Sequence, residues 1–252
     1  MARVIAFANQ KGGVAKTTTV LSIGVALAEL GRRVLGVDLD PQGALTYSAG
    51  ADPDDLDETI NDVLVRKLPL EKVIVTREID IAPANVDLAG AEAVLFTKTG
   101  REFALERALR DVTGRYDYVL IDCPPSLGIL TINGLTAAQE VLIPLQCEAL
   151  SHRGVGQLLE TLTDIRRFTN PHLEIAGVIP TLYDGRSKHA QLVLADVGGR
   201  YGVTVLEPPV RRTIRFAEAV QAGRSILAYA PNHPASEAYR AHARRIDQGV
   251  AA

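Results

Sequence analysis

Two lysines and two adjacent glycines follow a short apolar run near the start of the chain, and their spacing suits phosphate binding. Residues 9–17 read NQKGGVAKT. Gly12 and Gly13 allow backbone N–H groups to approach phosphate oxygens because no Cβ stands in the way. Lys16 would pair with the β- and γ-phosphates of a nucleotide, and the Thr17 hydroxyl would ligate Mg²⁺. The segment therefore predicts a nucleotide phosphate site.

The elements on either side of this segment support the same prediction. Residues 4–8 form an apolar run typical of a buried strand, and a helix of small and aliphatic residues is expected over 17–30. Strand, glycine loop, lysine, threonine and helix is the layout of a P-loop. The general pattern has glycine where this chain has Gln10 and Ala15. Alanine is tolerated at the second position if its φ is negative, so Ala15 weakens the match to the pattern without excluding it.

Aspartates at the ends of two other predicted strands could complete the site. Asp38 and Asp40 alternate at the end of the run 33–38, at the strand edge where open α/β sheets bind ligands. Asp122 ends the hydrophobic run YDYVLID, where a carboxylate can hold Mg²⁺ through a water. Turn chemistry before Pro41, and capping of the turn after residue 122, are the structural alternatives.

Three motifs resemble those of one family. KGGVAKTT resembles the deviant Walker A motif, KGGxGK[ST], of the ParA/MinD group of P-loop ATPases, and VDLDPQG and IDCPPSLG resemble ParA segments. The resemblance extends from Val4 to about Leu227. It implies that Lys11 reaches the nucleotide of a second subunit in an ATP-sandwiched homodimer. It also implies that Asp40 positions the attacking water and that Asp38 lies near Mg²⁺. An ordinary surface lysine is the alternative for Lys11.

The resemblance supplies a full set of expected site residues. Those implied in catalysis are Lys11, Lys16 and Asp40, and those implied at Mg²⁺ are Thr17, Asp38 and Asp122. Those implied in ATP binding are Lys11, Gly12, Gly13, Val14, Ala15, Lys16, Thr17, Thr18 and Pro209.

The alternation of strand and helix patterns predicts a single α/β domain over residues 1–252. We expect a P-loop NTPase fold, a mostly parallel twisted sheet with helices on both faces. Later strands are expected at 79–82, 116–122, 141–145, 175–180 and 203–206. Later helices are expected at 59–64, 88–96, 102–112, 129–138, 151–168 and 234–252, and two more are expected after the loop LYDGRSKHAQ and from Arg215 onward.

Composition and charge narrow the class of protein. The chain has 47% hydrophobic and 23% charged residues, which is ordinary for a soluble globular protein. No apolar run approaches the roughly 18 residues that span a bilayer, and the first strand leaves no room for a signal peptide, so we expect a cytoplasmic protein. Cys123 and Cys147 are too few for a disulfide framework or a zinc site. Packing roles are expected for both.

A basic segment lies on an otherwise acidic chain. The net charge is −3, yet residues 186–224 carry 7 Lys/Arg against 3 Asp/Glu. Such a segment could contact the phosphate backbone of DNA, and a solvated face would carry the same charges. Arg186 and Arg215 match ParA arginines implicated in DNA contact. Arg211 and Arg212 precede Arg215 by four and three residues, which places them beside it if the helix reaches back that far.

These features favour one activity within the family. The C-terminal stretch offers only Tyr239 and Ile246 as large apolar residues, which argues against a MinD-type membrane helix. No cluster motif surrounds Cys123, which argues against an iron protein of the nitrogenase type. The resemblance to ParA implies an ATPase that partitions chromosomes or plasmids. As in that family, it would bind double-stranded DNA non-specifically on the nucleoid and respond to a ParB-type centromere-binding protein. A related ATPase that positions another cargo, and a ligase of the dethiobiotin synthetase type, are the alternatives.

Overall fold

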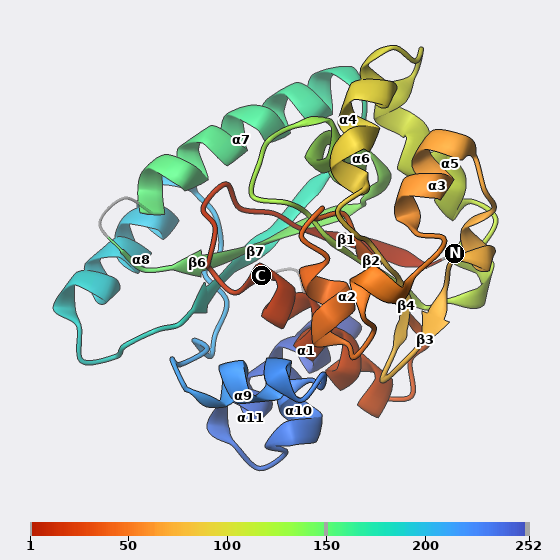
Figure 1. Ribbon diagram of the computed structural model, residues 1–252. Coiled ribbons are helices and arrows are strands. Elements are labelled where there is room, and N and C mark those ends of the chain that lie inside the picture. Colours follow the sequence, from red (N-terminus) through yellow and green to blue (C-terminus); the bar gives the residue numbers. More distant parts are fainter. Residues whose placement is uncertain (1, 149–150, 250–252) are drawn as a thin grey trace.

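The central feature of the computed structural model is one seven-stranded sheet, and the structure describes residues 2–148 and 151–249 (Figure 1). The strand order is β3-β4-β2-β5-β1-β6-β7. All neighbouring strands are parallel except β3 and β4. The strands are β1 (Arg3–Phe7), β2 (Val34–Asp38), β3 (Val75–Thr76), β4 (Asp80–Ala82), β5 (Tyr118–Asp122), β6 (Glu140–Gln146) and β7 (Glu174–Thr181). The predicted mostly parallel sheet is confirmed.

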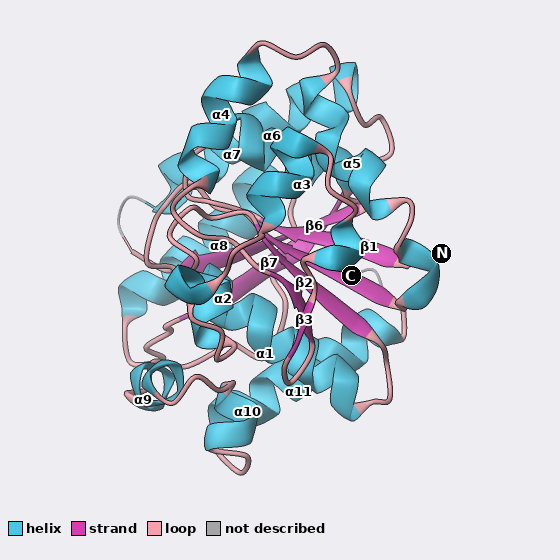
Figure 2. Cartoon of the chain, turned by 45° about the vertical axis from the view of Figure 1, so that its right-hand side comes forward, coloured by secondary structure: helices cyan, strands magenta, loops and turns pink. Residues whose placement is uncertain are grey.

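Helices cover both faces of the sheet, with α3 to α7 on one side and α1 and α9 to α11 on the other (Figure 2). The α-helices are α1 (Lys16–Glu29), α2 (Ala44–Ser48), α3 (Ile60–Arg66), α4 (Leu88–Phe96), α5 (Ala104–Leu109), α6 (Ile129–Ala137), α7 (Ser151–Phe168), α8 (Lys188–Tyr201), α9 (Arg215–Gln221), α10 (Ile226–Tyr229) and α11 (Pro234–Asp247). Short 3₁₀ turns lie at Pro53–Asp55, Leu70–Lys72, Arg101–Phe103 and Thr113–Arg115. No helix in the described ranges is long and apolar enough to cross a bilayer.

The alternation of side chains along β1 shows how the sheet divides two cores. Val4 and Ala6 belong to the cluster under α4 to α7, whereas Ile5 and Phe7 belong to the cluster under α1 and α11. Successive side chains of a strand point to opposite faces, so a strand covered on both sides is apolar at every position. This explains why the sequence shows continuous apolar runs.

Three predicted elements differ from the structure. Residues 203–206 form no strand: Val205 makes only an isolated bridge to Val178, because a left-handed turn at Gly202 and the Pro208-Pro209 pair leave little extended chain. The helix predicted over 102–112 is a 3₁₀ turn followed by α5. The last predicted helix ends at Asp247, and residues 250–252 of that prediction lie outside the described part. Elements β3, α2 and α10 were not predicted.

Candidate nucleotide-binding and catalytic site

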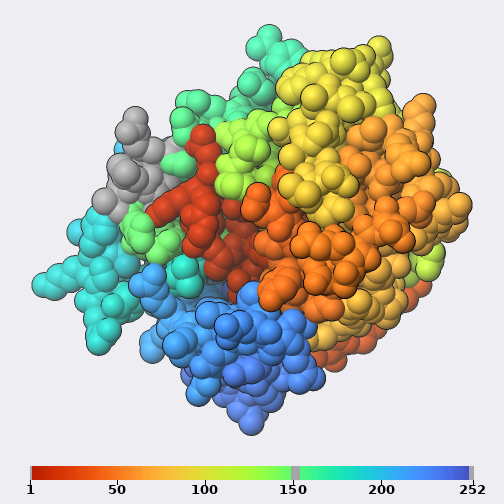
Figure 3. Space-filling model, viewed as in Figure 1, coloured from red at the N-terminus to blue at the C-terminus, as the bar shows by residue number. Residues whose placement is uncertain are grey.

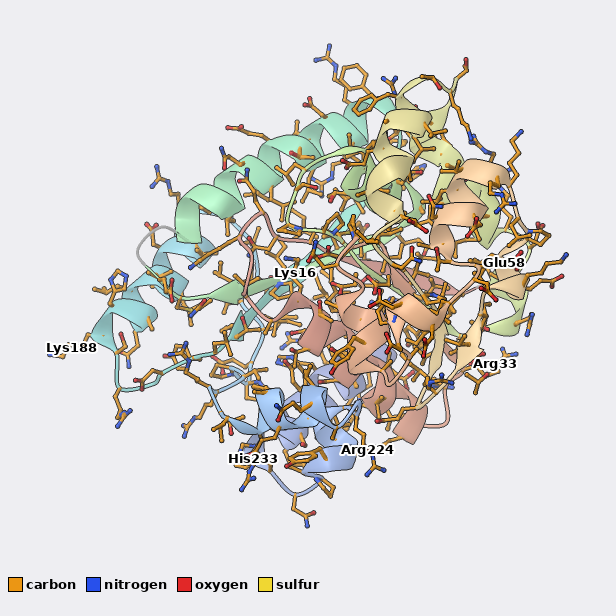
Figure 4. The ribbon with its side chains drawn as sticks, viewed as in Figure 1. Lys16, Arg33, Glu58, Lys188, Arg224 and His233 are labelled. Atoms are coloured by element: carbon orange, nitrogen blue, oxygen red, sulfur yellow. The ribbon has the colours of Figure 1, made fainter. Side chains whose placement is uncertain are left out.

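The predicted phosphate loop joins β1 to α1 at the carboxyl edge of the sheet. Figure 3 shows this N-terminal segment, in red, at the surface of the face in view, and Figure 4 places Lys16 near the centre of that face. The Lys16 side chain is largely buried, and its Nζ lies 3.5 Å from the Lys11 carbonyl oxygen. Burial lowers the pKa of Lys16, while the Asp122 carboxylate acts in the opposite direction. A buried cation at the start of α1, beside the helix N-terminus, is suited to bind phosphate.

Ala15 does not have the negative φ at which alanine would be tolerated without strain. Its φ is +61°, in the left-handed region. The reason lies in the contacts around the loop. The Thr19 amide and hydroxyl both donate to the Ala15 carbonyl oxygen, at 3.0 and 2.7 Å, and the Thr181 hydroxyl donates to the Val14 carbonyl oxygen at 2.8 Å. Surrounding structure holds the loop in a shape that costs alanine free energy.

Asp122 and Thr17 form the pair expected of a magnesium site. The Thr17 hydroxyl donates to Asp122 Oδ2 at 2.6 Å. The other carboxylate oxygen, Oδ1, is buried and accepts no hydrogen bond from the described residues. Burial first, and the nearby charge of Asp38 second, raise the pKa of Asp122. A buried carboxylate oxygen without a partner, next to a hydroxyl, is the donor set that a hard cation such as Mg²⁺ prefers.

Asp38 is fully buried and already accepts three hydrogen bonds. Its Oδ2 accepts from the Thr46 amide and hydroxyl at 2.9 and 2.8 Å, and its Oδ1 accepts from the Asp40 amide at 3.1 Å. Burial raises its pKa, and the hydrogen bonds from Thr46 act against that change. Asp38 therefore holds α2 and the turn that carries Asp40, in addition to lying near Asp122.

Asp40 lies in that turn, half-buried, and its Oδ1 accepts from the Gln42 amide at 3.0 Å. The charge of Asp40 contributes to raising the pKa values of both Asp38 and Asp122. The two strands that end in Asp38 and Asp122 are paired in register. Sequence-based placement of the three carboxylates at one edge of the sheet therefore agrees with the structure, while their catalytic roles stay predictions.

Lys11 is held within its own chain. Its Nζ lies 2.5 Å from Glu148 Oε2, and the Gln146 side chain donates to the other carboxylate oxygen of Glu148 at 2.6 Å. The Lys11 amide donates to the side chain of Asn9, which is itself buried and donates to the Pro144 carbonyl oxygen. The end of β6 thus fixes the first part of the loop.

Three supporting residues were missed by the sequence analysis. Thr181 and Thr19 donate hydrogen bonds to loop carbonyls. The hydroxyl of Tyr239, a fully buried residue of α11, lies 3.1 Å from the Thr19 hydroxyl. A polar residue directly after a buried strand was a usable signal for Thr181. Nothing local in the sequence indicates that Tyr239, in the last helix, would approach α1.

Pro209, the remaining implied ATP contact, lies in a loop fixed beside the end of β7. The next residue, Val210, donates its amide to the Pro180 carbonyl oxygen at 2.8 Å. The His242 Nε2 lies 2.9 Å from the Pro208 carbonyl oxygen. Pro209 is therefore at the carboxyl edge of the sheet, as the phosphate loop is.

Three of the four predicted DNA-contacting arginines, Arg186, Arg211 and Arg212, line one hollow, though the helix that the spacing suggested does not bring them together. Helix α9 begins at Arg215 and does not reach back to Arg211, which bridges to Tyr183 instead. The Arg212 amide donates to the Tyr183 carbonyl oxygen at 3.3 Å. A hollow of about 610 Å³ is lined by Leu182, Tyr183, Asp184, Gly185, Arg186, Arg211 and Arg212. The Arg186 side chain is 93% exposed.

The cysteines have the environments of packed residues. Cys123 is fully buried, and burial raises its pKa. A Cβ added at Gly134 would approach Cys123 Sγ to 2.9 Å, which shows how closely α6 packs on β5. Burial raises the pKa of Cys147 to about 11. Thiols with raised pKa values are poor nucleophiles and poor ligands.

Comparisons with known proteins agree with the geometry. A family model described as an AAA domain matches residues 2–175. The chromosome partitioning protein ParA of Caulobacter vibrioides is 42% identical over 249 residues, covering 97% of this chain and 93% of the relative. The chain belongs to the ParA/MinD family of partitioning ATPases. Another relative in this family, the sporulation initiation inhibitor protein Soj of Bacillus subtilis, is 40% identical and covered over 98% of both chains.

A solved structure from Mycobacterium smegmatis is similar to this ParA/MinD-family chain over its whole length. It is described as cobyrinic acid a,c-diamide synthase with bound ADP and magnesium. The sequence identity is 51%, the TM-score is 0.89, and the match covers 100% of this chain and 98% of the other. The predicted P-loop fold is thereby confirmed.

Proposed function

We propose that this chain is an ATP-dependent DNA-partitioning protein. Mg-ATP binding would form a sandwich homodimer that binds double-stranded DNA non-specifically, and hydrolysis, stimulated by a ParB-type partner, would release it from the nucleoid. The observation that carries the nucleotide part is the buried Asp122 Oδ1 without a partner beside the Thr17 hydroxyl. The similarity to ParA and Soj supports the partitioning role.

The proposed reaction is phosphoryl transfer from ATP to water. Mg²⁺, when bound, would offset charge on the phosphate oxygens, and Thr17 and Asp122 would hold it, with Asp38 close by. Lys16 would bind the phosphates from its own subunit, and Lys11 those of the partner subunit. Asp40 would orient the water, because a carboxylate at the strand edge can accept its proton.

The proposed DNA surface consists of Arg186, Arg211 and Arg212, which line the hollow next to Tyr183, together with Arg215 at the start of α9. Arg186 pairs with Asp184 and Arg215 with Glu218, at 3.2 and 2.7 Å, and both ion pairs are solvent-exposed. Exposed pairs of this kind contribute little, so the arginines can exchange a carboxylate for a phosphate. Binding would be independent of sequence, since phosphate contacts carry no base information. A dimer would double the number of contacts and the counterions released.

Replacing Arg186 and Arg215 together by alanine tests the DNA surface. We expect ATP-driven dimerisation to persist while DNA co-sedimentation is lost. The matched control is Arg110→Ala with Arg167→Ala, two arginines outside the basic segment, which should bind DNA with the parental dependence on salt. If the Arg186/Arg215 variant keeps that dependence, the DNA surface is elsewhere.

A second candidate function follows from the description of the Mycobacterium smegmatis structure, which names an amide-forming synthase. An enzyme of that kind would couple ATP cleavage to the joining of a carboxylate and ammonia. ATP turnover should then depend on both and leave an amide product. Measuring phosphate release with cobyrinic acid and ammonium, and separately with DNA and a ParB-type protein, distinguishes the two functions. We expect stimulation only in the second case.

A further inference from the structure

A groove with an apolar floor and a basic rim lies between α3, α4 and α5, away from the nucleotide loop. Its volume is about 310 Å³. In Figure 1, α3 and α5 lie side by side at the right-hand edge, whereas α9, which is part of the basic segment, lies at the bottom. Neither the proposed ATP chemistry nor the proposed DNA surface uses this groove.

The floor is made of aliphatic side chains from three elements. Leu64 of α3, Leu95 of α4 and Leu70 are buried, and Ala104 and Ala108 of α5 are partly buried beside them. Small alanines on α5 leave the space open, because a larger residue at either position would extend into it. An apolar recess of this size can take one large aliphatic or aromatic side chain.

The rim carries four cations and one acid: Lys67, Lys98, Arg101, Arg107 and Asp111. Arg101 pairs with Glu102. Lys98 Nζ donates to the Val65 carbonyl oxygen and Arg107 Nη1 to the Gly100 carbonyl oxygen, so these contacts neutralise no charge. Within the described ranges, Lys67, Lys98 and Arg107 form no ion pair with a carboxylate.

Lys67 also has an unusual backbone. Its φ is +60°, and it ends α3 with its amide donating to the Asp62 carbonyl oxygen. The left-handed region is less favourable for a lysine than for glycine, because the lysine Cβ approaches the following carbonyl oxygen there. The chain therefore places a cation at a position where glycine would be the less costly residue.

We propose that this groove binds an acidic, amphipathic segment of a protein partner. One large apolar side chain would enter the floor, and flanking carboxylates would pair with Lys67, Lys98 and Arg107. A recessed floor requires a protruding anchor, which a peptide helix has and a flat bilayer surface lacks. DNA would satisfy the cations and leave the aliphatic floor without a contact. Charge complementarity and the recess together favour an acidic peptide.

The test uses the full chain and a random 12-residue peptide library displayed on phage, followed by synthesis of the enriched peptides. We expect the enriched sequences to combine Asp or Glu with Leu, Phe or Met at helical spacing. Fluorescence anisotropy should show at least tenfold weaker binding to Lys67→Glu/Arg107→Glu, and similarly to Ala108→Trp, which fills the floor. Two matched controls should bind as the parent does. These are Lys72→Glu/Arg110→Glu, with exposed cations outside the groove, and Ala93→Trp on the exposed side of α4.

Several outcomes would overturn the proposal. Enrichment of no peptide, or of peptides without acidic residues, excludes an acidic segment as the ligand. Equal affinity for the groove variants and their controls places the binding elsewhere. Phosphatidylglycerol vesicles and DNA are tested with the same variants. If the chain binds either of them, and the groove variants lose this binding while their controls keep it, the ligand belongs to a different class. ATP binding and thermal unfolding are measured for every variant. If both are unchanged, weaker peptide binding is not caused by misfolding of the variant.

Discussion

Lys11 and Glu148 form an ion pair within one chain, across 137 residues of sequence, with Nζ and Oε2 2.5 Å apart. The pair is partly exposed, at 33% and 54% of the two side chains. Ion pairs this exposed contribute less than about 1 kcal/mol. Lys11 can therefore leave Glu148 at little cost in free energy. The proposed contact between Lys11 and the nucleotide of a partner subunit requires such a release.

Replacing Lys16 and replacing Lys11 should impair different steps, nucleotide binding in the first case and dimerisation in the second. Lys16→Ala removes the buried cation at the start of α1, and we expect it to lose ATP binding. Lys11→Ala should bind ATP with little change but fail to dimerise. Equilibrium nucleotide binding and light scattering separate the two effects. A Lys11→Ala protein that dimerises with ATP as the parent does would exclude the cross-subunit role.

Asp40→Ala should affect turnover far more than affinity. A missing general base or water-orienting group typically costs a factor of about 10²–10⁴ in rate. We expect the variant to bind ATP, to remain dimeric for longer and to release phosphate slowly. Asp54→Ala, which removes an exposed acid of a neighbouring turn, is the control. Phosphate release at the parental rate from Asp40→Ala would require another group to orient the water.

The left-handed Ala15 gives a prediction for stability. Left-handed backbone costs a non-glycine residue about 1–2 kcal/mol, and glycine loses part of that gain through its more flexible unfolded chain. Ala15→Gly should therefore raise the free energy of unfolding by up to about 1 kcal/mol in urea titrations. Ala15→Val, a β-branched residue at positive φ, should lower both stability and ATP affinity. Lys67→Val, at φ +60° away from the nucleotide loop, should lower stability alone. Unchanged stability in both valine variants would contradict the strain.

His242 should make stability depend on pH. Burial lowers its pKa to about 4, while an unfolded histidine has a pKa of about 6.5. The unfolded chain therefore binds the extra proton between these values, and stability present above about pH 6.5 is lost as the pH falls toward 4. At pH 5 the expected loss is about 2 kcal/mol.

The pH prediction is checked with two histidine variants. His242→Gln keeps a donor for the Pro208 carbonyl oxygen without the titration, so the slope of unfolding free energy between pH 7 and 5 should flatten. His189→Gln, on the exposed side of α8, should keep the parental slope. An unchanged slope in His242→Gln would assign the pH dependence to other groups.

The positions of the aspartates at the carboxyl edge of the sheet could be predicted because the sequence patterns that give them are local. Apolar runs predicted the main strands. Two of these runs end in residues proposed for the magnesium site, Asp38 and Asp122. What it could not predict depends on contacts between distant segments. The conformation of Ala15 depends on the hydrogen bond that Thr181 of β7 donates to the Val14 carbonyl oxygen. The bridge between Tyr183 and Arg211 replaces the helical spacing inferred for the arginines.

The order of the strands has a consequence for synthesis on the ribosome. Strand β1 is made first yet lies between β5 and β6, so its neighbours appear only when residues 118–122 and 140–146 have left the exit tunnel. The helix that buries Tyr239 against Thr19 emerges later still. The phosphate loop, though translated first, is among the last parts to acquire its final contacts. A nascent chain should therefore depend on protection from aggregation until nearly all of it has emerged.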